Sequence, residues 1–160
     1  MSFGEAIKTC FQKYATFSGR ARRSEYWYFV LFNVLFMLGF ALIARVFPEA
    51  KFLTYLYLVY SLAIVIPSLA VGVRRLHDIG KRGWNMFILL IVALLNSSIT
   101  VLGKSSLKIG SGVLLILAII ALALTVLFVV WLCKDSQPGE NKWGPNPKEV
   151  QSENNSGRNY

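Results

Sequence analysis

Long apolar runs separated by short polar segments dominate this 160-residue sequence. Four apolar stretches, none of which contains a charged residue, cover residues 26–44, 52–73, 86–102 and 113–132. At a rise of about 1.5 Å per residue, helices of these lengths span roughly 25 to 33 Å, which matches a bilayer core of about 30 Å. Because the stretches are apolar on every face, they cannot serve as surface helices in water. The pattern predicts an all-α membrane protein with four transmembrane helices in a single membrane domain, residues 1–148.

The composition supports this assignment, since 55% of the residues are hydrophobic and only 16% are charged. The first 25 residues hold no apolar core of the signal-peptide type, and the first apolar run is followed by three more. We therefore expect the first transmembrane helix to act as the anchor.

The basic residues are distributed unevenly among the polar segments. Thirteen lie in the N-terminal segment, the second loop and the tail, whereas the first and third loops hold four. The positive-inside rule then predicts that both termini are cytoplasmic. The formal charge of +9 is explained by this topology. Nucleic-acid binding is not expected, because the charge is divided among short loops.

The N-terminal segment has its own periodicity. Apolar residues recur every three or four positions from Phe3 to Phe17, opposite polar residues such as Lys8. This predicts an amphipathic helix over about residues 3–17, broken at Ser18-Gly19, that lies in the membrane interface or packs against the ends of the bundle.

The cysteine and histidine content makes a disulfide, a metal site or a bound cofactor unexpected. Cys10 and Cys133 are both predicted to be cytoplasmic, where thiols stay reduced. His77 is the one histidine of the chain, and structural metal sites use about four ligands.

Three polar motifs adjoin the apolar runs on the predicted cytoplasmic side. They are FSGRARRSEYW from Phe17, RRLHDIGKRGW from Arg74, and a turn-rich segment over 134–147. In the second motif the helix is expected to continue to Asp78 and to end at Gly80. Spacings of three or four residues allow structural ion pairs of Asp78 with Arg74 or Arg75, and of Glu25 with Arg22. Aromatic anchors at the interface are expected at Trp27, Trp84, Trp131 and Trp143.

With these motifs in this order, the chain resembles the bacterial inner-membrane family catalogued as domain of unknown function 805. The resemblance covers about residues 3–148, and it implies a small four-helix inner-membrane protein without implying an activity. One departure is Asn85, where the family often has a second Trp after the one that matches Trp84. The tail, residues 149–160, lies outside the resemblance and is predicted to be disordered.

Three functions are compatible with the motifs. The first is a non-catalytic module that binds anionic lipid headgroups, or an acidic partner, because Arg offers bidentate geometry to phosphate. Its candidate residues are Arg20, Arg22, Arg23, Arg74, Arg75, Arg82 and Lys142, with His77 in the same polar cluster. The competing interpretation is that these residues only set topology and tie loops together. The second function is a channel or transporter subunit that forms a homo-oligomer or joins a membrane-protein partner.

The third function, a lipid-directed enzyme that uses His77 and Asp78, is not expected. Neighbouring residues of a helix point about 100° apart, and no further catalytic group accompanies the pair.

Overall fold

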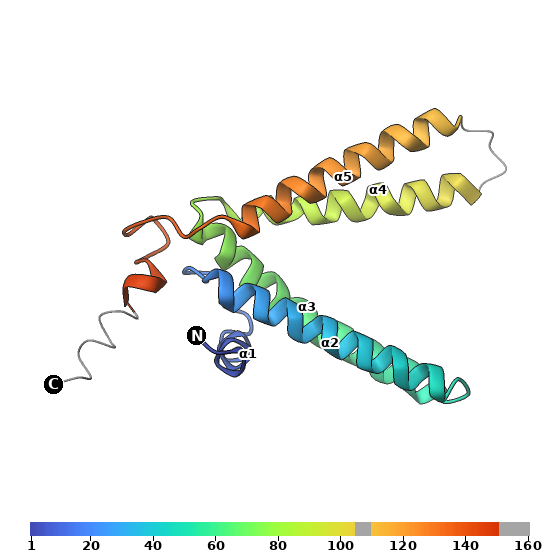
Figure 1. The fold of residues 1–160 in the computed structure, drawn as a ribbon, viewed down its shortest axis with the longest axis horizontal. Helices are drawn as coiled ribbons and strands as arrows, with labels where there is room; N and C mark the ends of the chain where they lie inside the picture. The colour runs from blue at the N-terminus through green and yellow to red at the C-terminus, as the bar shows by residue number, and fades with distance from the viewer. Residues whose placement is uncertain (105–109, 151–160) are drawn as a thin grey trace. The chain divides into compact units, whose positions relative to one another are not determined.

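The computed structural model describes residues 1–104 and 110–150, which form an all-helical fold (Figure 1). In chain order the elements are α1 (Phe3–Gln12), α2 (Arg23–Val46), α3 (Lys51–Asp78), the 3-10 helix η1 (Gly83–Met86), α4 (Phe87–Lys104) and α5 (Ser111–Cys133). In this part of the chain four helical segments are long and apolar enough to cross a membrane, as predicted. The fold comprises two compact units, residues 1–83 with 135–150, and residues 84–134.

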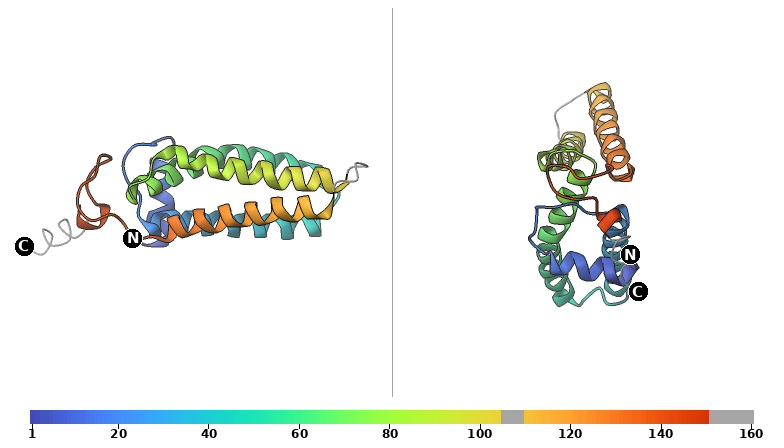
Figure 2. Two further views of the ribbon diagram at one scale, coloured as in Figure 1. Left: turned by 90° about the horizontal axis from the view of Figure 1, so that it is seen from above. Right: turned by 90° about the vertical axis from the view of Figure 1, so that its left-hand side faces the viewer.

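In the first unit, α2 and α3 form a hairpin, and α1 lies across both (Figure 2). The N-terminus of α1 is fixed by a capping box, in which the Ser2 hydroxyl accepts from the Glu5 amide and the Glu5 carboxylate accepts from the Ser2 amide. Cys10 of α1 is buried with Phe29 of α2 and Val71 of α3. The buried face of α1 therefore joins the two long helices.

The predicted N-terminal helix is too long, because α1 ends at Gln12 and not near residue 17. The chain turns at Lys13, whose carbonyl accepts from the Thr16 amide. The Tyr14 hydroxyl then donates to the carbonyl of Ala63 in α3 at 2.5 Å. This contact with α3 replaces the further helical turn.

Asn33 joins α2 and α3 through an interhelical hydrogen bond inside the span. Its Oδ1 accepts from the Tyr60 hydroxyl at 2.8 Å, and its amide donates to the carbonyl of Phe29 at 2.7 Å. Both polar ends of the amide are thus satisfied within the protein.

The second unit is the α4–α5 hairpin. The α5 helix is apolar nearly throughout, and its buried residues are Ala121, Phe128 and Leu132. The hydroxyls of Thr100 and Thr125 each donate to the carbonyl four residues earlier in their own helix. Such back-bonding lets a polar side chain lie in an apolar environment.

The predicted disordered tail includes two residues that the structure describes, at 149 and 150, and these belong to a helical turn over 147–150. Asn146 caps this turn, because its Oδ1 accepts from the Lys148 amide at 3.0 Å and its carbonyl accepts from the Glu149 amide. The rest of that prediction, residues 151–160, lies outside the described part of the chain.

Candidate functional site: a buried arginine cluster

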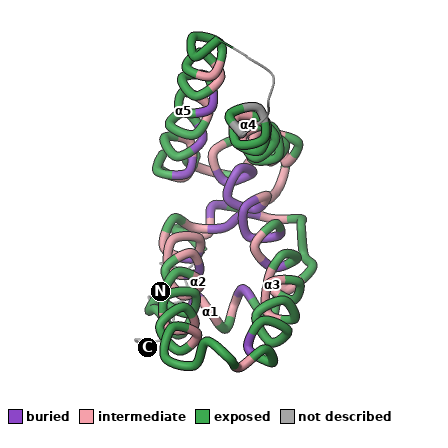
Figure 3. Tube along the Cα trace, turned by 90° about the vertical axis from the view of Figure 1, so that its right-hand side faces the viewer, coloured by how far each residue is buried: buried purple, intermediate pink, exposed green. Residues whose placement is uncertain are grey.

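The C-terminal end of α3 supplies the centre of the candidate site. Arg74, Arg75 and Asp78 are each no more than 1% exposed, and Figure 3 shows the buried residues of α3 gathered toward this end. The helix ends in a Schellman motif, with the Lys81 amide donating to Leu76 and the Gly80 amide to His77. Gly80 has a φ of 76°, so the predicted helix end at this glycine is confirmed.

Asp78 receives two guanidinium groups and a hydroxyl. Arg20 Nε lies 3.0 Å from its Oδ1, and Arg75 Nη1 lies 2.5 Å from its Oδ2. The Ser136 hydroxyl also donates to Oδ2 at 2.6 Å. These three donors come from three separate segments of the chain, so one buried carboxylate holds all three together.

The Arg20 guanidinium also binds the turn-rich segment, residues 134–147, and we call this set of contacts around Asp78 and Arg20 the junction. Its Nη1 donates to the carbonyls of Gly139 at 2.7 Å and Gly144 at 3.3 Å. Its Nη2 donates to the carbonyl of Gln137 at 2.5 Å. The planar fork of Arg, with five N–H donors, suits such a set of acceptors. Arg20 therefore links the three polar motifs of the sequence.

A second buried ion pair lies between α2 and α3. Arg74 Nη1 is 2.6 Å from Glu25 Oε1, and both side chains are at most 5% exposed. The Cys10 thiol lies 4.0 Å from the same carboxylate oxygen. Burial, and then the negative charge of Glu25, raises the pKa of the Cys10 thiol to about 12. We name Arg20, Glu25, Arg74, Arg75 and Asp78 the arginine cluster.

His77 joins the turn segment to the loop before α2. Its Nδ1 lies 3.2 Å from the carbonyl oxygen of Gly19. Because a carbonyl oxygen only accepts hydrogen bonds, Nδ1 is the protonated ring nitrogen that donates this one. The ring stacks on Trp143 at 4.5 Å between centroids, and the Lys142 ammonium lies 4.2 Å from the centroid of that Trp. Asn141 donates to the His77 carbonyl at 3.0 Å.

Comparison with known proteins shows the family of this chain. The chain matches the family described as "Protein of unknown function (DUF805)" over residues 14–145, a region that holds the whole arginine cluster. The chain belongs to the DUF805 family. The inner membrane protein YhaH of Escherichia coli strain K12 is 30% identical over 139 residues, which cover 86% of this chain and 91% of YhaH. The inner membrane protein YhaI of the same strain is 28% identical over 137 residues, covering 86% of this chain and 90% of YhaI. No solved structure matches the chain.

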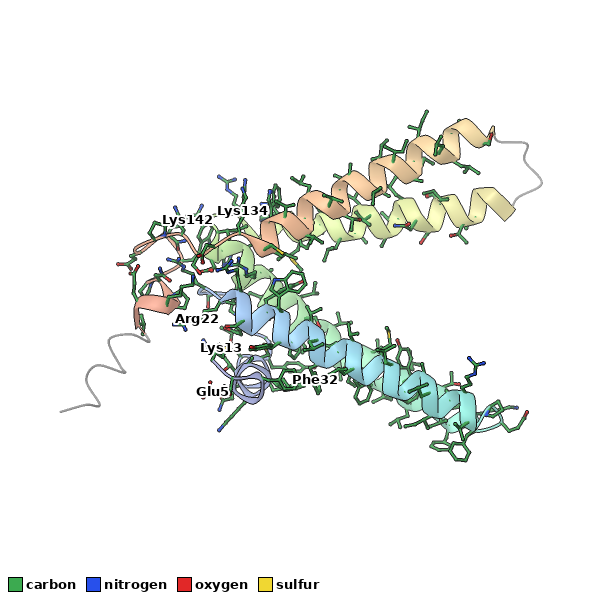
Figure 4. The ribbon with its side chains drawn as sticks, in the orientation of Figure 1. Glu5, Lys13, Arg22, Phe32, Lys134 and Lys142 are labelled. Carbon is green, nitrogen blue, oxygen red and sulfur yellow. The ribbon has the colours of Figure 1, made fainter. Side chains whose placement is uncertain are left out.

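Family membership and the four candidate spans together make the chain an integral inner-membrane protein. In this DUF805 chain the basic residues singled out from the sequence fall into two groups. Arg20, Arg74 and Arg75 are buried in the arginine cluster. By contrast, Arg23, Arg82 and Lys142 are exposed, and Arg22, directly before α2, is half-buried. Figure 4 labels Arg22 and Lys142. We name the exposed three, Arg23, Arg82 and Lys142, the basic rim.

The basic rim includes one exposed ion-pair network. Arg23 Nη2 lies 3.2 Å from Asp135, and the Lys148 ammonium contacts the same carboxylate. The Lys148 hydrogen bond, followed by the Ser136 amide, lowers the pKa of Asp135 below its ordinary value. Exposed pairs of this kind contribute little to stability.

The four predicted anchors have different surroundings. Trp27 packs edge-to-face on Tyr26 at 5.4 Å, and Trp84 is 75% exposed and stacks on Phe87. Trp131 is half-buried near the end of α5. Trp143 packs on His77, so it belongs to the polar junction of the first unit.

Sequence reasoning missed the residues that bind Arg20, His77 and Asp78 through backbone carbonyls or polar side chains. They are Gly19, Ser136, Gln137, Gly139, Asn141 and Gly144. The signal was present in part, because Gly139 and Gly144 have positive φ values of 67° and 121° in a segment predicted to consist of turns. Those turns direct their carbonyls at Arg20.

Proposed function

We propose that this DUF805 protein is a non-catalytic membrane module whose basic rim binds anionic lipid headgroups on the cytoplasmic side of the inner membrane. The proposal rests on the division of the basic residues into a buried group and an exposed group. The arginine cluster ties three segments into one buried junction, and Arg82 and Lys142 extend from that junction as exposed cations. Juxtamembrane cations attract anionic headgroups with about 1 kcal/mol each.

The buried arginines have a different role in this proposal. Arg20 and Arg75 donate to Asp78 and to backbone carbonyls, so they position the segments that carry the basic rim. Arg74 is engaged by Glu25 through Nη1. Direct contact between these three arginines and a headgroup stays a prediction from the sequence.

The proposed orientation places both termini in the cytoplasm. It is supported by the charge asymmetry, thirteen basic residues against four. In spheroplasts, an impermeant maleimide should leave Cys133 unlabelled until the membrane is permeabilised. In a Cys133→Ser background, Glu49→Cys should be labelled at once. Labelling of Cys133 in sealed spheroplasts contradicts this orientation.

We also propose that α1 lies in the cytoplasmic interface. Its apolar side chains Phe3 and Phe11 are 38% and 42% exposed, although each contacts an α2 ring. Glu5 and Lys8 of α1 and Lys13 at its end are exposed polar residues, and Figure 4 labels Glu5 and Lys13. An amphipathic helix with this distribution places its aromatic face in the headgroup boundary.

A catalytic role has no support in the geometry of the cluster. Asp78 is occupied by Arg20, Arg75 and Ser136, and His77 by Gly19 and Trp143. Among the described residues no three His, Cys, Asp or Glu side chains are placed to hold a metal.

The alternative of a channel or transporter subunit also gains no support. Span residues such as Asn33, Asn96 and Thr125 donate to carbonyls of their own helices.

The proposal is tested with the full chain in nanodiscs that contain phosphatidylethanolamine and phosphatidylglycerol. Native mass spectrometry measures the phosphatidylglycerol that stays bound to wild type and to the double variant Arg82→Gln with Lys142→Gln. The matched control is Lys104→Gln with Lys108→Gln, which removes two basic residues predicted on the other side of the membrane. Loss of two cations should weaken retention by about 2 kcal/mol, or roughly 30-fold, while the control behaves as wild type. Equal retention by both double variants overturns the proposal, and binding of an acidic protein partner then becomes the better hypothesis.

A further inference from the structure

A mainly apolar cavity of about 320 Å³, open on one side, lies between α2 and α3, next to the residues that connect them. Its lining is contributed by one face of α2, by the connection, and by the first two turns of α3. The lining residues are Met37, Phe40, Ala41, Ala44, Phe47, Pro48, Ala50, Leu53, Thr54 and Tyr57. All of these residues belong to the first unit.

The lining combines small side chains with aromatic rings. Ala41 and Ala44 lie one turn apart on α2, while the rings of Phe40 and Tyr57 pack at 5.2 Å between centroids. The polar side-chain atoms among the lining residues are the hydroxyls of Thr54 and Tyr57. The cavity is open on one side, and lining residues such as Phe47 and Met37 are 59% and 47% exposed, so bilayer chains can reach it. An apolar occupant fits this mainly apolar lining better than water.

We propose that the cavity binds one acyl chain of a zwitterionic membrane phospholipid. The lining residues of α2 run from Met37 to Ala44, about 10 Å along the helix at 1.5 Å per residue, and the lining continues to Phe47 just after α2. This depth lies within one leaflet, whose share of a 30 Å hydrocarbon core is about 15 Å. The volume lies at the lower end of the range for ligand sites, about 300 to 1,000 Å³, and suits a single chain better than a whole lipid.

The charges beside the cavity favour a phospholipid headgroup. Arg45 and Lys51 directly follow the lining residues Ala44 and Ala50, and both are exposed. Glu49, also exposed, lies between them in the chain. Two cations and one carboxylate complement a headgroup that carries both a phosphate and an ammonium group. A free fatty acid offers only a carboxylate, for which Glu49 is unfavourable.

The test uses the full chain in nanodiscs doped with phosphatidylethanolamine that carries a photoactivatable diazirine on one acyl chain. After irradiation, mass spectrometry maps labelled residues in wild type and in Ala44→Phe, which fills the cavity. The matched control is Leu42→Phe, because Leu42 is 66% exposed and does not line the cavity. Labelling of the lining residues should fall about tenfold in Ala44→Phe, the loss expected when roughly two CH₂ groups are displaced at about 0.8 kcal/mol each. Thermal unfolding checks that both variants fold.

Unchanged labelling in folded Ala44→Phe, or labels spread evenly around the outer faces of α2 and α3, overturns the proposal. Preferential labelling by a free fatty acid with the same diazirine overturns the assignment to a phospholipid. Covalent dimers formed by a photoreactive amino acid at position 44 would assign the cavity to a second copy of the chain. None of these results depends on the phosphatidylglycerol measurement, so the two proposals can fail separately.

Discussion

The hydrogen bond between Tyr14 and Ala63 is expected to compensate for Pro67, because proline leaves one carbonyl of α3 without its helical donor. In an α-helix the carbonyl of residue 63 accepts from the amide of residue 67, and Pro67 has no amide hydrogen. The Tyr14 hydroxyl lies 2.5 Å from that carbonyl. Ala63 lies within the apolar run 52–73, ten residues or about 15 Å from its end at residue 73, so water cannot supply the donor cheaply.

The expected cost of losing this hydrogen bond depends on what the Ala63 carbonyl can bind once the helices separate. Hydrogen bonds between transmembrane helices average about 0.6 kcal/mol, because their groups find other partners when the helices separate. The Ala63 carbonyl has no such alternative, since Pro67 blocks it in either state. We therefore expect Tyr14→Phe to lower the free energy of unfolding by about 1 to 2 kcal/mol, toward the cost of an acceptor left unsatisfied in an apolar environment.

Pro67→Ala restores the helical donor and should make the Tyr14 hydroxyl redundant. In that background we expect Tyr14→Phe to cost no more than about 0.5 kcal/mol, which gives a coupling energy of about 1 kcal/mol. The four proteins of this cycle are compared by unfolding in mixed micelles with a denaturing detergent. Tyr28→Phe serves as the control, because its ring packs on Phe3 and it loses the same atom without exposing a carbonyl. Equal costs of Tyr14→Phe in both backgrounds would refute the reasoning.

Three further predictions concern the junction of the first unit. Asp78→Asn leaves Arg20 and Arg75 buried without their counter-charge, and should cost about 3 to 5 kcal/mol in the free energy of unfolding, measured in micelles. Gly80→Ala should lower the free energy of unfolding by more than about 1 kcal/mol in the same assay, because φ at Gly80 is 76° and an added Cβ would lie 2.8 Å from Gln137 Oε1. An unchanged stability would contradict this conformation at the end of α3. The neutral Cys10 thiol stabilises the fold below its ordinary pKa of 9.0, and this contribution is lost as the pH rises toward about 12. N-ethylmaleimide at pH 8 should therefore label exposed Cys133 and not Cys10 until the protein unfolds, as mass spectrometry would detect.

Much of the fold could be predicted from hydropathy and turn chemistry. Runs of apolar residues define the four long helices to within a few positions, and Gly80 marks the end of α3 because its backbone conformation excludes most side chains. The end of α1 could not be predicted in this way. It depends on a bond from Tyr14 to a carbonyl 49 residues away, and the amphipathic pattern itself continues to Phe17.

The site was predictable only where its contacts are local. Spacing alone indicates the pair between Arg75 and Asp78, which are three residues apart. The partners of Arg74 and Arg20 are 49 and 58 residues away, respectively, and no helical spacing rule reaches so far. The burial of these arginines was not predictable from charge patterning either, because the positive-inside rule treats every loop cation as exposed to water.

This distinction explains why position 20 carries Arg and not simply a positive charge. Topology alone would accept Lys, since the positive-inside rule counts both residues equally. The Arg20 guanidinium, however, contacts the Asp78 carboxylate and the carbonyls of Gln137 and Gly139 at the same time, through three different nitrogens. A Lys ammonium is a single point donor and cannot reach acceptors arranged around a planar fork. Because a buried ion pair seldom adds net stability over apolar packing, the advantage of Arg20 lies in specifying which three segments meet. The position of the exposed basic rim therefore depends on a residue that is itself buried.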